Sequence, residues 1–144
     1  MTTKVGSRPL EGQECPVLPR VLLVDDNGPI LLRVAEALRA SCTIVGTATD
    51  GRSGIDAAAT LQPDVIVLDI SMPGMNGFEV AGSLREAGST AALIFFTVHQ
   101  EQDVMAAAFA AGACGYVTKQ RLFTDLEPAV HKAYVGLRFV SPLD

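Results

Sequence analysis

The sequence predicts an α/β fold in which a doubly wound, five-stranded parallel sheet is covered by five helices. The first observation is a set of short apolar runs without polar alternation, such as VIVL at 65–68, which indicates strands buried on both faces. The second is that segments with apolar residues at helical spacing lie between these runs. Right-handed crossovers would place such helices on both faces of the sheet.

The strands are expected where apolar, mostly β-branched or aromatic residues follow one another. These runs cover residues 21–24, 42–46, 65–68, 91–96 and 115–118. The second run, CTIVG, is short and suits an outer strand. The other four end at charged or hydroxyl side chains, and we expect the carboxylate of Asp69, after the third run, to be exposed.

The helices are expected where apolar residues recur three or four positions apart. They cover residues 28–40, 52–62, 78–87, 100–111 and 122–135. Asn27 is a suitable N-cap for the first helix, and Pro29 is tolerated in its first turn. Gly88 and Gly112 are suited to end the third and fourth helices.

Composition narrows the possible functions. The chain has 16 acidic and 11 basic residues, and this net charge of -5 would repel a polyanion, so we expect no direct binding to nucleic acid. No apolar run approaches the roughly 20 residues that cross a bilayer, so we expect no membrane association. Cys15, Cys42 and Cys114 lack CxxC spacing, so neither a disulfide framework nor a zinc site is indicated, and a cytoplasmic location fits best.

The ends of four predicted strands carry polar side chains that should meet at one edge of the sheet. They are Asp25, Asp26, Asp69, Thr97 and Lys119. Each alone has an ordinary explanation as a turn former, a helix cap or a surface charge. Together, three crowded carboxylates need a cation, and an all-oxygen ligand set suits Mg²⁺. A carboxylate beside that ion could attack a phosphoryl group.

Four motifs resemble the receiver domain of two-component response regulators, in the right order and at the right spacing. They are VLLVDDN, VIVLDISMPGMNG, IFFT and GYVTK. The stretches AAGACGYVTK and AVHKAYVGLRFVSPLD are most similar to the NarL/FixJ class. The resemblance implies a flavodoxin-like (CheY-like) sheet with strand order 2-1-3-4-5. It divides the chain into a flexible amino-terminal arm (1–19), a receiver domain (20–137), and a carboxyl-terminal tail or start of a linker (138–144).

The resemblance also assigns roles to site residues. Asp69 matches the phosphoacceptor, and Asp25, Asp26, Asp69 and the backbone carbonyl of Ser71 match the Mg²⁺ ligands. Thr97 and Lys119 match the residues that bind phosphoryl oxygens. Tyr116 matches the switch aromatic, which would rotate inward as Thr97 moves and so change the surface from helix 4 to helix 5.

Three further residues line the expected site at positions that vary within the family: Ser71, Val98 and His99. By the same resemblance they tune how fast the phosphoryl group is gained or lost. His99 could donate to a phosphoryl oxygen or orient water, although the pattern favours a solvent-exposed loop histidine with no catalytic role. The bulk of Val98 could narrow access to Asp69.

The implied function is a signalling module that accepts a phosphoryl group from a sensor histidine kinase and controls an output domain or partner protein, and a homodimer is possible. It is not expected to be an enzyme, although it would assist its own phosphorylation and dephosphorylation. The alternative is an interaction domain of the same fold that works without phosphorylation. A Mg²⁺ phosphatase and a flavin-binding protein fit less well, since no second acid follows Asp69 closely and the first loop is acidic.

Overall fold

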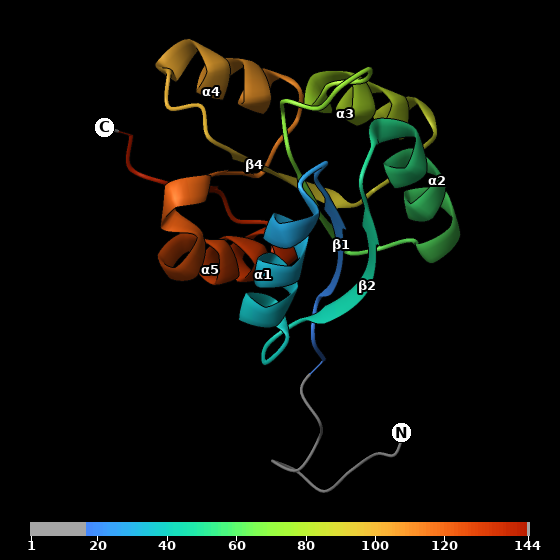
Figure 1. Ribbon diagram of the computed structural model, residues 1–144, viewed down its shortest axis with the longest axis horizontal. Helices are drawn as coiled ribbons and strands as arrows, with labels where there is room; N and C mark the ends of the chain where they lie inside the picture. The colour runs from blue at the N-terminus through green and yellow to red at the C-terminus, as the bar shows by residue number, and fades with distance from the viewer. Residues whose placement is uncertain (1–16, 144) are drawn as a thin grey trace, which may run out of the picture.

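The computed structural model describes residues 17–143, which form one six-stranded parallel sheet with helices on both faces (Figure 1). The strands lie in the order β2-β1-β3-β4-β5-β6. The predicted flexible arm falls mostly on residues 1–16, outside the described residues. The flavodoxin-like order of the first five strands is confirmed.

The strands and helices alternate along the chain. The strands are β1 (Arg20–Val24), β2 (Thr43–Ala48), β3 (Val65–Leu68), β4 (Ala92–Thr97), β5 (Gly115–Thr118) and β6 (Phe139–Val140). The helices are α1 (Gly28–Leu38), α2 (Gly51–Leu61), α3 (Gly77–Glu86), α4 (Gln102–Ala110) and α5 (Leu122–Tyr134), with a short 3₁₀ turn, η1 (Lys119–Arg121), before α5. None of the helices within residues 17–143 is long and apolar enough to span a membrane.

Two apolar layers separate the sheet from its helices. Side chains alternate across each strand, so Val21 and Leu23 of β1 join one layer while Leu22 and Val24 join the other. The first layer packs against α1 and α5, and the second packs against α2, α3 and α4 (Figure 1). Because both faces are covered, the strands need continuous apolar sequence, which is what made them recognisable.

The structure adds one strand to the five that the sequence predicts. Residues 138–144 were expected to form a tail or the start of a linker, but Phe139 and Val140 pair in parallel with Gly115 and Tyr116 of β5. Two residues are too few for a detectable pattern, so only the tertiary contact reveals this strand. Its partner β5 is therefore not the edge of the sheet over these residues.

Local capping fixes the loops at the carboxyl edge of the sheet. The Asn27 side chain accepts a hydrogen bond of 3.1 Å from the backbone N–H of Ile30, as predicted for the start of α1. Asn76 and Glu79 form a reciprocal capping box at the start of α3. These caps hold the loops after β1 and β3, which carry the aspartates.

Gly77, the first residue of α3, lies so close to the loop after β3 that a side chain does not fit there. Its backbone N–H donates 2.8 Å to the carbonyl of Ile70. A Cβ at this position would collide with the carbonyl oxygen of Asp69 and lie 2.9 Å from the Cα of Ile70. A side chain here would therefore push α3 away from Asp69 and Ile70, which follow β3.

We predict that Gly77→Ala lowers the free energy of unfolding by about 2 kcal/mol, because backbone atoms cannot make room for the methyl group. Gly82→Ala is the matched control in the same helix, since a Cβ there meets nothing within 4 Å. It should stabilise the protein by about 0.5 to 1 kcal/mol through the usual preference for Ala over Gly in a helix. Urea unfolding measures both, and equal effects of the two substitutions would contradict the proposed contact.

Candidate functional site

Three carboxylates meet where β1 and β3 end. The two strands are paired up to Val24 and Leu68, and the backbone N–H of Asp69 donates 2.9 Å to the carbonyl of Val24. One carboxylate oxygen from each of Asp25, Asp26 and Asp69 lies within 4.8 Å of the others. The structure thus brings together the three aspartates that the sequence singled out.

The burial of these aspartates differs from one prediction. We expected an exposed carboxylate at Asp69, but the residue is only 4% exposed, and Asp25 is 2% exposed. Asp26 alone is open to solvent. The site is therefore a sheltered acidic cluster with one accessible member.

Lys119, which follows β5, places a positive charge beside the three aspartates. Its Nζ lies 2.7 Å from Asp25 Oδ2 and 3.4 Å from Asp69 Oδ2. It also lies 5.6 Å from the centre of the Phe96 ring. Burial alone would lower the pKa of Lys119, but the hydrogen bond to Asp25 and the charges of both aspartates outweigh it and raise the pKa. The lysine therefore stays protonated.

The pKa of Asp69 is raised to about 6 by burial first and by the nearby charge of Asp25 second. Lys119 and the backbone N–H of Ser71, which lies 3.3 Å from Asp69 Oδ1, oppose this shift without cancelling it. At neutral pH Asp69 is thus mostly ionised, and its charge is incompletely compensated. A bound cation would neutralise the remaining negative charge.

The donor set fits Mg²⁺. Three aspartate oxygens converge within 4.8 Å, and no softer ligand is part of the cluster that the structure describes. Hard oxygen ligands with one solvent-accessible side leave room for the waters that Mg²⁺ retains. The residues present are therefore compatible with this ion.

A chain of polar contacts extends from Asp69 to the loop after β4. Ser71, held at Asp69 through its backbone, has its Oγ 2.8 Å from His99 Nε2. His99 Nδ1 lies 3.4 Å from Glu101 Oε1, a residue that the sequence reasoning missed. Only its position two residues after His99 could have pointed to it. His99 is thus a half-buried side chain with polar contacts at both ring nitrogens.

Thr97 and Val98 take different positions beside this chain. Thr97 is fully buried, and its Oγ1 accepts a hydrogen bond of 3.2 Å from the backbone N–H of His99. Val98 is 66% exposed. Thr97 therefore sits within the fold at the strand end, whereas Val98 lies on the surface.

Tyr116 is already inside the molecule. It is fully buried, and its hydroxyl donates 2.9 Å to the carbonyl of His99. Burial, and then the charge of Glu101, raises the pKa of this phenol to about 12. We expected an inward rotation of Tyr116 to accompany modification of Asp69, whereas in this structure the inward position is already occupied.

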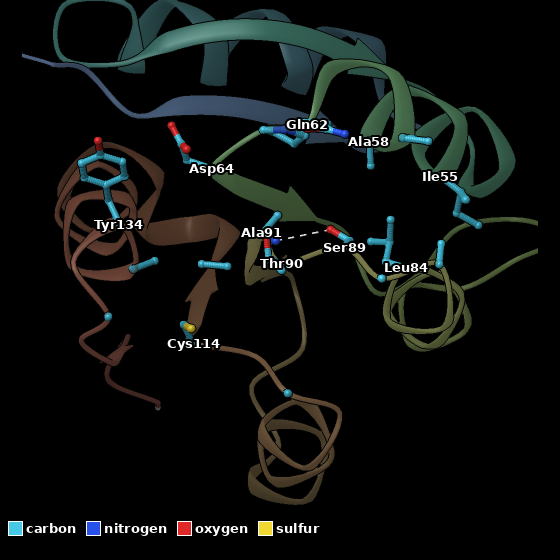
Figure 2. A pocket seen from close by; sticks show the side chains of 18 residues that line it. Ile55, Ala58, Gln62, Asp64, Leu84, Ser89, Thr90, Ala91, Cys114 and Tyr134 are labelled. Carbon is cyan, nitrogen blue, oxygen red and sulfur yellow. Dashed lines mark hydrogen bonds between the residues drawn. The ribbon is translucent and has the colours of Figure 1, made fainter.

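A separate groove of about 750 Å³ lies at the opposite edge of the sheet, where the strands begin (Figure 2). Asp64, Ala91 and Cys114, which precede β3, β4 and β5, line it together with the ends of α2, α3 and α5. It shares no residue with the acidic cluster. The acidic cluster and the groove are therefore distinct features.

Comparison with known proteins identifies the class. Residues 21–131 match the family model described as the response regulator receiver domain. The nitrate/nitrite response regulator NarL of Escherichia coli (strain K12) is 36% identical over 123 residues, which cover 84% of this chain. The chain belongs to the response regulator receiver domain family and is homologous to NarL-type regulators. It spans only 57% of the length of that NarL.

Solved structures agree with this assignment. The receiver domain of the response regulator NarL from Mycobacterium tuberculosis superposes with a TM-score of 0.79 at 31% identity, covering 84% of this chain and 99% of that one. A two-component response regulator of the LuxR family from Aurantimonas sp. SI85-9A1 gives 0.83 at 30% identity, covering 88% and 91%. The CheY-like receiver fold predicted from the motifs is therefore confirmed.

We predict that Asp69 makes the stability of the metal-free protein fall with rising pH. Its pKa is raised on folding, so the stability that its protonated form supplies is complete below pH 4 and is lost as the pH rises through about 6. In Asp69→Asn this loss is absent. Relative to the wild type, the variant should therefore gain about 2 kcal/mol of unfolding free energy between pH 4 and pH 7.5.

Urea unfolding in a chelator at the two pH values measures this difference. Asp56→Asn is the control, because Asp56 is an exposed aspartate on α2. A variant whose advantage over the wild type is the same at both pH values would show that Asp69 is not perturbed in this way.

Proposed function

We propose that this receiver domain accepts a phosphoryl group on Asp69 from a sensor histidine kinase in the cytoplasm, with Mg²⁺ bound by Asp25, Asp26, Asp69 and the backbone carbonyl of Ser71. The observation that carries the proposal is the convergence of three carboxylates within 4.8 Å beside one half-buried lysine. Membership of the receiver family supports it.

Asp69 is suited to act as the nucleophile. Its carboxylate oxygen would attack the phosphorus of a phosphohistidine, the imidazole would leave, and an acyl phosphate would remain on Asp69. A pKa of about 6 leaves the carboxylate ionised at neutral pH while keeping it more basic than an ordinary aspartate. The bound ion would neutralise charge on the phosphoryl oxygens during transfer.

Two other strand ends would stabilise the product. Lys119 Nζ already lies 3.4 Å from Asp69 Oδ2, so it can pair with a phosphoryl oxygen attached there. Thr97 ends the neighbouring strand β4 and would donate its hydroxyl to a second oxygen. Both contacts favour the charged state, in which the phosphoryl group adds about -1.5 to -2 of charge.

The output would be a change in the surface formed by α4, β5 and α5. Tyr116 links this surface to the site through its hydrogen bond to the carbonyl of His99, in the loop that follows Thr97. Movement of Thr97 toward a phosphoryl oxygen would therefore strain that loop and the contact with Tyr116. An output domain, a partner protein or a second copy of the chain would read the change.

The alternative function is a protein-interaction domain of the same fold that works without phosphorylation. One observation favours it, which is that Tyr116 is fully buried and its hydroxyl is already bonded to the carbonyl of His99, so its side chain has little room to respond to a change at Asp69. Direct phosphorylation separates the two functions.

We expect the intact mass to rise by one phosphoryl group when the protein is incubated with Mg²⁺ and acetyl phosphate or a phosphorylated histidine kinase domain. Asp69→Asn and chelation of Mg²⁺ should each abolish the increase, because they remove the nucleophile and the counter-charge. Asp56→Asn should leave it unchanged. If neither donor adds mass and fluoroberyllate does not bind, the phosphorylation-independent function replaces the proposed one.

We also propose that Ser71, Val98 and His99 tune the lifetime of the phosphoryl group. The Ser71–His99 hydrogen bond would shield one side of Asp69 from water. The exposed side chain of Val98 would narrow the path by which a phosphodonor reaches Asp69.

His99→Ala should speed loss of the phosphoryl group roughly fivefold, since one lost hydrogen bond corresponds to about 1 kcal/mol. His131→Ala is the matched control, because His131 is the other histidine of the chain and lies on α5. Decay of the phosphorylated mass with time gives both rates. An unchanged rate in His99→Ala would mean that His99 does not shield the site.

A further inference from the structure

The segment that follows α5 returns to the sheet and covers the side of β5. Phe139 and Val140 form β6 beside Gly115 and Tyr116. The backbone N–H of Phe139 donates 3.1 Å to the carbonyl of Cys114, and that of Ser141 donates 2.8 Å to the carbonyl of Tyr116. The backbone groups on this side of β5 could pair with a strand of another protein, but residues 139–141 of this chain already occupy them.

Side chains of this segment contact the helices on both sides of β5. The Arg138 guanidinium lies 4.2 Å from the centre of the Phe109 ring of α4. Phe139 packs against the apolar layer that includes α5, and Leu143 packs against the layer that includes α4. Residues 138–143 therefore lie on the surface formed by α4, β5 and α5, which the proposed function uses for output.

Ser141 makes the deeply buried polar contacts of residues 138–143. It is 1% exposed, its hydroxyl donates 2.7 Å to Asp125 Oδ2, and its Oγ accepts 3.3 Å from the backbone N–H of Thr118. Asp125 is itself 5% exposed and is held from the other side by Arg121 Nε at 2.6 Å. Burial makes this hydrogen bond costly to lose and specific for a hydroxyl group.

The connection from α5 to this segment keeps its side chains in solvent, although its backbone is hydrogen-bonded to the last turn of α5. The helix ends at Tyr134, and Gly136 has a φ of +85°. Val135 and Leu137 are 66% and 54% exposed. The strand itself has only two residues. A short strand on an exposed connection can leave the sheet without disrupting the strands that form the core.

We propose that the side of β5 between α4 and α5 is a strand-binding surface that residues 138–143 occupy in cis. Its partner would be a protein that offers an extended segment of the same chemistry, with an aromatic residue followed two positions later by serine or threonine. The backbone of that segment would replace the bonds to Cys114 and Tyr116, and its hydroxyl would replace that of Ser141 at Asp125. This inference rests on the proposed function for the identity of the output surface.

The first measurement is hydrogen exchange of the full chain with Asp69 unphosphorylated, so that it does not depend on phosphoryl transfer. In Ser141→Ala, amides of residues 137–143 should exchange about tenfold faster, because a buried hydrogen-bonded hydroxyl is lost. Ser83→Ala on α3 is the matched control and should leave them unchanged. Unchanged exchange in Ser141→Ala would overturn the role of Ser141, and loss of protection throughout the sheet would show that the segment is inseparable from the fold.

The second measurement uses a fluorescein-labelled peptide with the sequence GLRFVSPLD, which is that of residues 136–144. The peptide should bind Ser141→Ala at least tenfold more tightly than the wild type, in which the cis segment competes at a high effective concentration. A peptide with alanine in place of its serine should bind at least tenfold more weakly. Equal binding of the two peptides, or equal binding to the variant and the wild type, would overturn the proposed surface.

Discussion

The whole site depends on the crowding of like charges at the ends of two adjacent parallel strands. β1 and β3 are neighbours although β2 lies between them in sequence, so the order of the strands reverses at this point, where ligands of such sheets bind. Asp25 and Asp69 are placed there by strands that cannot shift, because apolar residues anchor both of their faces. Lys119 offsets only part of the charge. The fold thus leaves a net negative charge at this site, and a bound cation would neutralise it.

Much of this arrangement could be predicted because it depends on local sequence. Buried strands such as Val65–Leu68 need continuous apolar residues, and a polar residue that ends such a run must lie at the edge of the sheet. Parallel strands bring these ends to one edge of the sheet, so the sequence alone indicates that the polar side chains at the ends lie near one another. The positions of the three aspartates and of Lys119 follow from these two rules.

What the sequence did not predict involves contacts between distant residues. The burial of Asp69 depends on the loops that enclose it, and the inward position of Tyr116 depends on the path of the loop that carries His99. The strand Phe139–Val140 exists only because β5 offers unpaired backbone groups. Each of these features involves residues far apart in sequence, and no periodicity or motif encodes such a meeting.

Strand β5 connects the proposed phosphoryl site to residues 138–143, which pair with its side. The hydroxyl of Tyr116 contacts the loop beside Thr97, while its carbonyl accepts from Ser141, and Lys119 follows at the end of the strand. All four residues of β5 are buried, so a displacement at one end of the strand would be felt by the residues packed along it. Coupling between two sites is reciprocal. On the proposed function, a partner that replaced the cis segment and preferred one position of β5 would shift the phosphorylation equilibrium of Asp69 by the same factor as phosphorylation shifts the affinity for that partner.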